Sequence, residues 1–466
     1  MTKQKDVASA ISPLMHTLST YVAGAVRRAL PAAVQERAKH HLLDTLAAMV
    51  SGAPLLPGQR AIAFAAAQGG RPEAGVIGTS IVTSAINAAL ANGMLGHADE
   101  TDDAYYLALV HPGCAVVPAA LAMGERERSS GTALLRAITL GYDICARTSK
   151  ALGIEHFRSA GHSTHSFGGT FGAAAAAAGA LAGLDARGVR HLMSYAAQQA
   201  SGLSCWARDV EHVEKAFDFG GMPARNGVTA AAMVSAGFTG VDDVFSGDRN
   251  FFQAFEVYAK PKEFIAGLGT RFDILQTAIK RWPVGYPIQA PLDALANVMA
   301  RHGIVAADVE KVHITLDQQG ARTVNGRTMA DINLQYLAAV MLIEGDISFE
   351  ASHDPLRTRD PAVGRLRQRI ELSGSDTLSK ARTTQAIVEV TMRGGRVLRH
   401  HTRAVRGSAT NPMAREEVGA KAFGLLAPTL GRAKAQRLIE TVWQLETVKD
   451  VRALRPLLQP PAPRRK

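Results

Sequence analysis

Apolar residues recur every three or four positions through most of the first 257 residues, which is the spacing of amphipathic helices. Residues 34–50 show this spacing most clearly, and the pattern stops at Gly52. The same pattern predicts further helices over residues 118–124, 133–152, 172–184 and 188–200. Several of these segments are rich in Ala and Gly on all sides, which predicts helices buried in a large helical core.

The pattern changes in the last third of the chain. Residues 309–316 and 385–398 alternate apolar and polar side chains, which predicts strands. The second segment contains Gly394 and Gly395, which predicts a hairpin turn within it. Residues 333–343, between the two segments, return to helical spacing.

These patterns predict a mostly α protein with more than one domain. A length of 466 residues is consistent with this, because domains usually hold roughly 100–200 residues. We expect a large all-helical domain, a smaller α+β lid domain and a C-terminal return to the helical domain. Their predicted bounds are 1–275, 276–410 and 411–466.

The composition indicates a globular protein of a reducing compartment. Hydrophobic residues make up 47% of the chain and charged residues 20%, as in ordinary globular proteins. Three cysteines are too few for a disulfide framework or a cysteine metal site. The long apolar stretches are interrupted by Gly, so none reads as a membrane span. We therefore expect a cytoplasmic protein without a membrane partner.

The net charge of +11 does not indicate a nucleic-acid partner. Nucleic-acid binding requires basic side chains clustered on one face, whereas Lys and Arg are spread along this chain apart from a short basic tail. A dispersed positive charge instead favours solubility and the attraction of anionic substrates.

The first polar cluster is an acidic segment that interrupts the helical pattern. Its members are His97, Asp99, Glu100, Asp102, Asp103 and His111. The segment is compatible with a solvated acidic loop that caps a helix. Its oxygen atoms also suit a divalent metal, although the EF-hand spacing is absent. A third interpretation is proton transfer between a carboxylate and an imidazole across a substrate.

The second polar cluster is a glycine-rich turn before the helix predicted at 172–184. His162 and His165 alternate there with the hydroxyl groups of Ser163, Thr164 and Ser166. A helix N-terminus attracts carboxylates and phosphates through its free amide groups. The alternative is a helix cap with exposed histidines. The spacing matches neither a standard zinc pattern nor the Gly-x-Ser-x-Gly elbow of hydrolases.

Two further segments offer cations to an anionic ligand. Lys215 and Arg225 lie in one of them, and Lys280 lies in the other. Taken alone, each segment is also typical of an ordinary charged surface. The chain has neither a Walker loop nor a dinucleotide-binding fingerprint.

In combination these segments resemble the MmgE/PrpD superfamily over nearly the whole chain. This superfamily includes 2-methylcitrate dehydratases, cis-aconitate decarboxylases and iminodisuccinate epimerases. The similar motifs are His97–Asp103 with His111-Pro112, His162-Ser163-Thr164, the segment from Lys215 to Gly227, Lys280-Arg281-Trp282-Pro283, and Gly407 to Pro412. Several motifs in the family's order are more specific than any one of them.

The resemblance implies a helical domain and a smaller α+β lid domain in a homodimer, with the site between the domains. It implies catalysis on a di- or tricarboxylate without a metal or organic cofactor. The predicted reaction is dehydration by proton abstraction next to a carboxylate. The alternatives are an epimerase, a cis-aconitate-type decarboxylase and a non-catalytic carboxylate-binding protein.

This sequence departs from the family pattern at two places that bear on the reaction. Asp103 stands where family members of assigned activity often have Thr, and the added charge favours a substrate with a hydroxyl, amine or imine group. Gln318 and Gln319 fall near the position of a tyrosine assigned to the decarboxylase site.

The resemblance and the side-chain chemistry together predict the site residues. Imidazoles titrate near neutral pH, which makes His111 and His162 the candidate acid and base. Lys215, with Lys280 and Arg225, is expected to hold substrate carboxylates and to stabilise developing negative charge. The predicted catalytic residues are His111, His162, Lys215, Asp99 and Asp103, and the predicted substrate-binding residues are Lys280, Arg225, His165 and Thr164.

Overall fold

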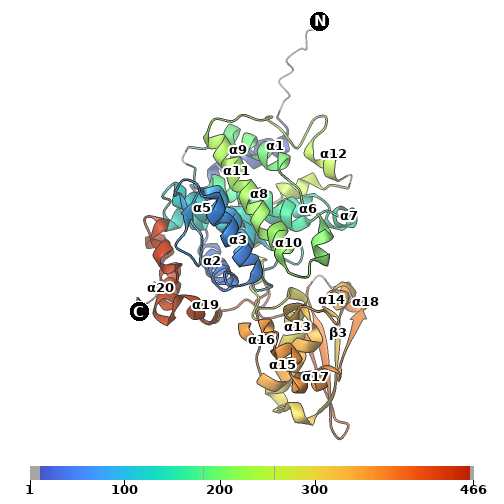
Figure 1. Cartoon of the computed structure of the whole chain (residues 1–466). Coiled ribbons are helices and arrows are strands. Elements are labelled where there is room, and N and C mark those ends of the chain that lie inside the picture. The colour runs from blue at the N-terminus through green and yellow to red at the C-terminus, as the bar shows by residue number, and fades with distance from the viewer. Residues whose placement is uncertain (1–10, 182, 257, 382, 462–466) are drawn as a thin grey trace. The chain divides into compact units, whose positions relative to one another are not determined.

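The computed structural model describes residues 11–461 except 182, 257 and 382. The chain forms two compact units (Figure 1). The helical unit comprises Met1–Ala98, Ala108–Leu275 and Leu426–Lys466, and the sheet unit comprises Asp99–Leu107 and Gln276–Leu425. Residues 99–107, which contain the four acids of the acidic segment, and residues 411–425 thus belong to the sheet unit, whereas His97 and His111 belong to the helical unit. The predicted bounds placed all of these residues outside the lid domain.

The helical unit is built around Ala-rich helices. Its central helix α8 (Thr164–Ala178) packs against α6 (Gly131–Ala151), α5 (Pro112–Arg126) and α11 (Met222–Ser235). The other helices of this unit are α1 (Pro13–Ala25), α2 (Ala32–Gly52), α3 (Leu56–Gln68), α4 (Ala85–Gly96), α7 (Ile154–Ser159), α9 (Ala186–Gln198), α10 (Val213–Ala216), α12 (Phe251–Phe255) and α20 (Arg432–Trp443). A two-residue pair of strands, β1 (Ala74–Gly75) and β2 (Val82–Thr83), joins α3 to α4.

Small residues allow these helices to approach closely. A Cβ atom placed on Gly172 of α8 would lie 2.6 Å from the Cβ atom of Cys145 and 2.7 Å from the carbonyl oxygen of Gly141, both on α6. Such a contact is shorter than packed atoms tolerate, so the α6–α8 spacing depends on glycine. This agrees with the buried, close-packed helices that the Ala and Gly content predicts.

The sheet unit contains a four-stranded mixed sheet in the order β4-β3-β5-β6. β3 (Val309–Asp317) pairs with β5 (Ala386–Met392) in antiparallel register with Ile314 opposite Val388, and β5 pairs with β6 (Val397–Thr402) through the predicted hairpin. β4 (Ile370–Ser375) pairs with β3 in parallel. The sequence pattern did not indicate β4 or its parallel pairing.

Helices supply the rest of the core of the sheet unit. α13 (Tyr286–His302) packs on β5 and β6, and α15 (Leu334–Glu344) packs on β4 and on α13 (Figure 1). The shorter helices are α14 (Gln318–Val324), α16 (Phe349–His353), α17 (Pro361–Arg367) and α18 (Asp376–Ser379), and α19 (Arg415–Leu430) runs on into the helical unit.

Two polar segments outside the predicted helices are largely helical. α8 begins at Thr164 rather than at residue 172, so His165 and Ser166 lie in its first turn. Residues 213–235 form one continuous run in which the π-helical turn Phe217–Gly221 links α10 to α11. Glycines in both segments pack against neighbouring backbone instead of ending the helix, and tertiary packing here overrides local propensity.

The predicted fold class is confirmed. The chain is 60% helical and 8% strand, with a large helical unit and a smaller unit that contains the sheet. None of the helices within residues 11–461 combines the length and the apolar character that a membrane span requires.

Candidate functional site

Three histidine rings surround Phe219 in the helical unit, and a fourth lies beside one of them. The imidazoles of His97 and His165 stack nearly parallel to the Phe219 ring, with centroid distances of 4.3 Å and 3.7 Å. Between ring centroids, His111 lies 5.0 Å from His97 and 5.3 Å from His165, and His212 lies 5.2 Å from His97. We call His97, His111, His165 and His212 the histidine cluster.

Helix ends bring the histidine cluster together. His97 follows the last residue of α4, His111 precedes α5, and His212 precedes α10. His165 is the second residue of α8. Because α5 packs against both α4 and α8, their ends converge although the histidines are far apart in the sequence.

The π-helical turn positions the Phe219 ring. Gly220 in this turn lies against Gly93 of α4 so closely that a Cβ atom on either residue would collide with the backbone of the other. A single π turn inserts one residue into a helix and is frequent at functional sites. The turn and the glycine contact together hold Phe219 among the imidazoles.

Lys215 brings a positive charge to the same aromatic ring. Its Nζ atom lies 5.2 Å from the ring centroid of Phe219 and 5.5 Å from that of Trp206. The Trp206 ring meets Phe219 edge-on at a centroid distance of 4.7 Å. An ammonium group within about 6 Å of an aromatic face is attracted by the ring quadrupole. Phe219 thus links the cation to the histidine cluster.

His165 is held neutral at the centre of this arrangement. Burial lowers its pKa well below the ordinary value for histidine, and the electrostatic effect of His111 and His97 lowers it further. Its Nδ1 atom is buried without a hydrogen-bond partner among the described residues. A neutral imidazole with an unpaired nitrogen can accept a proton or a hydrogen bond from a ligand.

Asp218, next to Phe219 in the chain, holds a proton near neutral pH. Burial raises its pKa to about 7, although hydrogen bonds from Ser163 and Ser166 act in the opposite direction. The Ser163 hydroxyl donates to its carboxylate over 2.5 Å. The helical unit therefore contains a carboxylic acid and an imidazole with perturbed pKa values close together, which is frequent at functional sites.

Hydrogen bonds fix the backbone that leads into His111. Leu109 adopts a positive φ of 47°, which is uncommon for a side chain of its kind. The Thr164 hydroxyl donates to the Leu109 carbonyl oxygen over 2.7 Å, and the Ser149 hydroxyl donates to the Ala108 carbonyl oxygen over 2.5 Å. The expected substrate-binding residue Thr164 thus holds the segment that carries His111.

In the sheet unit, the acidic segment surrounds Lys280. All four acidic side chains are buried. The Lys280 Nζ atom donates to the Glu100 carbonyl oxygen over 2.7 Å and lies 3.5 Å from a carboxylate oxygen of Asp102. Burial lowers the pKa of Lys280, but the negative charges of Asp102 and Glu100 outweigh this effect and raise it above the ordinary value. Lys280, which is buried, therefore pairs with the acidic segment, and its role in binding a substrate carboxylate stays a prediction.

His353 forms an ion pair with the first carboxylate of the acidic segment. Its Nε2 atom lies 3.1 Å from the Asp99 carboxylate, and its ring stacks on Phe349 at 4.1 Å. Asp99 also accepts a hydrogen bond from the Thr101 amide over 3.1 Å. Burial lowers the pKa of His353, whereas the hydrogen bond and charge of Asp99 raise it, to about 9. His353 is therefore protonated at neutral pH.

The structure gathers some predicted site residues and separates others. His111, His165 and Lys215 meet around Phe219, while Asp99, Asp103 and Lys280 lie together in the sheet unit. His162 instead stacks on Phe157 at 4.7 Å, among other phenylalanines. Arg225 lies 5.6 Å from the Phe217 ring and donates to the side chain of Asn226.

Sequence reasoning did not assign roles to several residues of these two clusters. They are His97, His212, Phe219, Asp218 and His353. The sequence weakly indicates a functional role for His97 and His212, because each histidine lies at a helix end beside other polar residues. His353 carries none, since its partner Asp99 lies more than two hundred residues earlier in the chain.

The helical unit also contains side chains of a kind that bind transition metals. The ligand atoms of His97 lie within 4.8 Å of those of Cys114 and of those of His212. Imidazole nitrogen and thiolate sulfur are ligands that zinc prefers. Within this unit a metal would be held by His97 with either Cys114 or His212, which makes metal dependence a necessary control for any activity.

Comparison with known proteins identifies both parts of the chain. Residues 16–263 match the MmgE/PrpD N-terminal domain, and residues 282–447 match the MmgE/PrpD C-terminal domain. Together these matches cover most of the chain in the expected order.

Curated relatives agree with these matches. A cis-aconitate decarboxylase-like protein of Aspergillus oryzae, oryM, is 25% identical over 92% of this chain and 94% of its own length. A cis-aconitate decarboxylase of Aspergillus terreus is 24% identical over 68% of this chain and 67% of its own length. These relatives support a lyase-type activity at the level of the family. The chain belongs to the MmgE/PrpD family.

Proposed function

We propose that this protein is a cofactor-free hydro-lyase that removes water from a small di- or tricarboxylate. The observation that carries the proposal is the gathering of His111, His165 and Lys215 around Phe219. Such a group combines two titratable imidazoles with a cation, which are the components needed to ionise a carbon next to a carboxylate.

In the proposed reaction a base removes the proton from the carbon next to a substrate carboxylate. The electron pair left behind forms the new carbon–carbon double bond, and the hydroxyl group on the neighbouring carbon leaves as water after it receives a proton. We assign the base to His165 because its imidazole is neutral and its Nδ1 atom has no partner among the described residues. The negative charge of a bound substrate would raise its pKa and strengthen it as a base.

His111 is the proposed acid. Its ring lies 5.3 Å from that of His165 between centroids, so one small substrate can contact both. His162, the earlier candidate, packs among phenylalanines, and we assign it no proton transfer. Lys215 is the proposed carboxylate-binding cation, which stabilises the negative charge that develops on that carboxylate during proton removal.

Asp99 and Asp103 are the proposed groups that orient the leaving hydroxyl group or a histidine. The Asp99 carboxylate pairs with His353, and a carboxylate accepts hydrogen bonds from hydroxyl groups. Asp103 adds a second acidic group to the same segment. This charge favours a substrate with a hydroxyl group over cis-aconitate, which has none.

Decarboxylation is the second candidate, because the relatives described above are named for cis-aconitate decarboxylation. The two reactions differ in their products, since decarboxylation releases carbon dioxide and dehydration does not. Incubation with cis-aconitate and with hydroxy acids such as citrate and 2-methylcitrate therefore separates them.

The test compares turnover of the substrate by site variants and by matched controls. We expect His111→Ala and Lys215→Ala each to lower kcat/KM by roughly 10²–10⁴-fold, the range for loss of an acid–base or charge-stabilising group. His156→Ala and Lys262→Ala change exposed residues of the same types and should leave turnover unchanged. Wild-type turnover in both site variants would overturn the assignment.

A chelator experiment tests the metal-free part of the proposal. Turnover should be the same after prolonged treatment with EDTA and after addition of Zn²⁺ to the treated protein. Loss of activity in EDTA that Zn²⁺ restores would instead assign a metal to His97 and its neighbours.

A further inference from the structure

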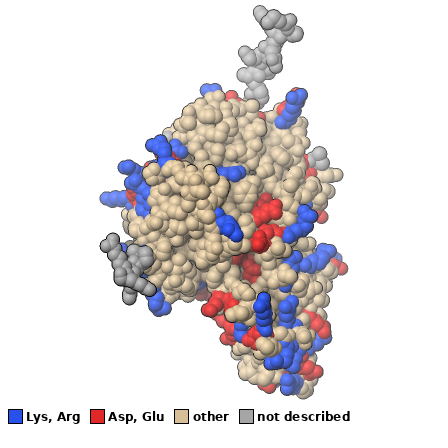
Figure 2. Space-filling view, viewed as in Figure 1, with Lys and Arg blue, Asp and Glu red and all other residues tan. Residues whose placement is uncertain are grey.

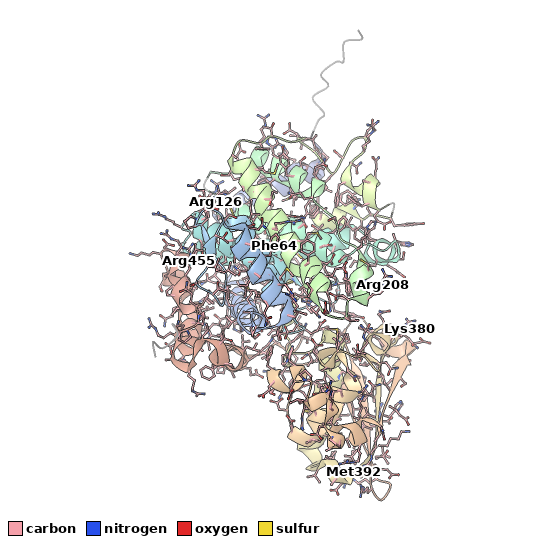
Figure 3. All side chains as sticks on the ribbon, viewed as in Figure 1. Phe64, Arg126, Arg208, Lys380, Met392 and Arg455 are labelled. Carbon is pink, nitrogen blue, oxygen red and sulfur yellow. The ribbon has the colours of Figure 1, made fainter. Side chains whose placement is uncertain are left out.

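A charged pocket lies at one edge of the helical unit, at the far end of α5 from His111. Its volume is about 390 Å³. Five arginines line it together with three glutamates and one proline, and the arginines are Arg71, Arg126, Arg128, Arg452 and Arg455. Lys and Arg side chains dominate this edge of the unit (Figure 2), where Arg126 and Arg455 are both marked (Figure 3).

Three of the arginines are held in place by acidic neighbours. The Arg455 Nε atom donates to Glu125 over 2.5 Å, and Glu125 also accepts the Gly75 amide over 2.8 Å. Arg126 lies 3.2 Å from Glu127, and Arg452 donates to Asp450 through two nitrogen atoms. These ion pairs order one wall of the pocket and reduce the entropy lost when a ligand binds.

The remaining two arginines have no such partner. Among the described residues no carboxylate forms an ion pair with Arg71 or Arg128, and both are exposed. The five guanidinium groups still outnumber the three carboxylates of the lining and the Asp450 carboxylate that pairs with Arg452. The electrostatics of the pocket therefore favour an anion.

The dipole of α5 does not by itself explain why five arginines meet at this pocket. Cations near the C-terminal end of α5 are favoured by the helix dipole, which accounts for Arg126 and Arg128. Arg71, Arg452 and Arg455, however, come from two other segments of the chain. Guanidinium groups from three segments around one pocket are the arrangement that binds a multivalent oxyanion through paired hydrogen bonds.

The pocket is separate from the histidine cluster. α5 begins directly after His111 and ends at Arg126, and its 15 residues span about 22 Å at the rise of an α-helix. A ligand in the pocket is therefore out of contact with His111.

We propose that this pocket binds a small anion with several phosphate or carboxylate groups, distinct from the substrate of the histidine cluster. Arg71 and Arg128 would contact the anion, and the paired arginines would support them. The proposal concerns binding and does not depend on the reaction that the protein catalyses.

Isothermal titration calorimetry in low-salt buffer tests this site, with inorganic pyrophosphate and citrate as the two probes. We expect saturable binding of at least one probe, and the preferred probe distinguishes phosphate from carboxylate recognition. The double variant Arg71→Gln/Arg128→Gln should weaken that binding by about tenfold or more, since each lost charge-assisted hydrogen bond is worth at least about tenfold in affinity. Citrate is also a candidate ligand of the histidine cluster. We therefore attribute to the pocket only the citrate binding that this double variant removes.

The matched control is Arg60→Gln/Arg187→Gln, which removes the same charge at exposed positions outside the pocket. The control should bind within about twofold of the wild type, because distant exposed charges are screened. Equal weakening in both double variants would show only non-specific attraction and would overturn the proposal. Absence of saturable binding of both probes to the wild-type protein would also overturn it.

Discussion

The Nε2 atom of His353 lies 3.1 Å from the Asp99 carboxylate, and this pair joins the last turn of α16 to the start of the acidic segment. The other ring nitrogen, Nδ1, lies 2.8 Å from the Phe349 carbonyl oxygen, which favours the doubly protonated ring. The ion pair thereby fixes the orientation of the Asp99 carboxylate. His353 is a positioning residue in the proposed mechanism, because it acts on the substrate only through Asp99.

Replacement of His353 should change how stability depends on pH. The pKa of His353 is raised to about 9, above its ordinary value of 6.5, so its contribution to stability is complete below pH 6.5 and is lost as the pH rises through about 9. His353→Gln removes this contribution. The variant should be less stable than the wild type at pH 6, and the difference should shrink towards pH 10, as measured by thermal unfolding.

A control variant separates this effect from a general loss of packing. His313 lies 3.7 Å from Glu389 on the exposed side of the sheet, where ion pairs contribute little. His313→Gln should unfold like the wild type over the same pH range. A constant difference between His353→Gln and the wild type at every pH would contradict the charged pair.

The contribution of Asp218 to stability should depend on pH in a different pH range. Its pKa is raised to about 7, so its contribution to stability is complete below about pH 4 and is lost as the pH rises through 7. Asp218→Asn stays neutral at every pH. Relative to the wild type, this variant should gain stability between pH 5 and pH 8, while the exposed control Asp248→Asn should not.

Replacement of Phe219 should change the titration of the neighbouring His165 imidazole. Phe219→Leu removes stacking on His97 and His165, worth roughly 0.5–1.5 kcal/mol for each aromatic pair. Phe264→Leu removes a buried ring elsewhere in the same unit. Both variants should be destabilised, but only Phe219→Leu should shift the NMR titration of His165. A shift of equal size in both would argue against a specific role for Phe219.

Lys280 should be required for folding of the sheet unit. Lys280→Met leaves the carboxylates of Asp102 and Glu100 buried beside an apolar side chain, which costs roughly 3–5 kcal/mol. Lys311 pairs with Glu371 at the surface, so Lys311→Met should cost about 1 kcal/mol or less. Denaturant unfolding measures both values, and similar values would contradict the role of Lys280.

The sequence was informative where local patterns decide the structure. Helical spacing at residues 34–50 and alternation at 309–316 predict α2 and β3 closely, because one buried face repeats with the period of the element. β4 was missed because its pairing partner β3 is remote in the chain and three of its six residues are only half-buried. A strand of this kind carries little alternation.

The candidate site was predictable in its residue types but not in its contacts. The polar clusters at His111, His165 and Lys215 stand out in the sequence and meet around one ring in the structure. That His165 rather than His162 joins the cluster depends on where α8 begins, and the predicted start was eight residues late. The ion pair of His353 with Asp99 depends on tertiary contact alone, so no local pattern could indicate it.

NMR spectroscopy of the purified protein in deuterated water, with citrate, 2-methylcitrate, cis-aconitate and iminodisuccinate as substrates, tests the central claim most directly. The proposed hydro-lyase should convert a hydroxy acid to its unsaturated product, or the reverse, and the hydrated acid formed should carry one deuterium next to a carboxylate. The conversion should be lost in His111→Ala and retained in His156→Ala. Carbon dioxide release from cis-aconitate, deuterium exchange without elimination, or binding without turnover of any acid would each contradict dehydration.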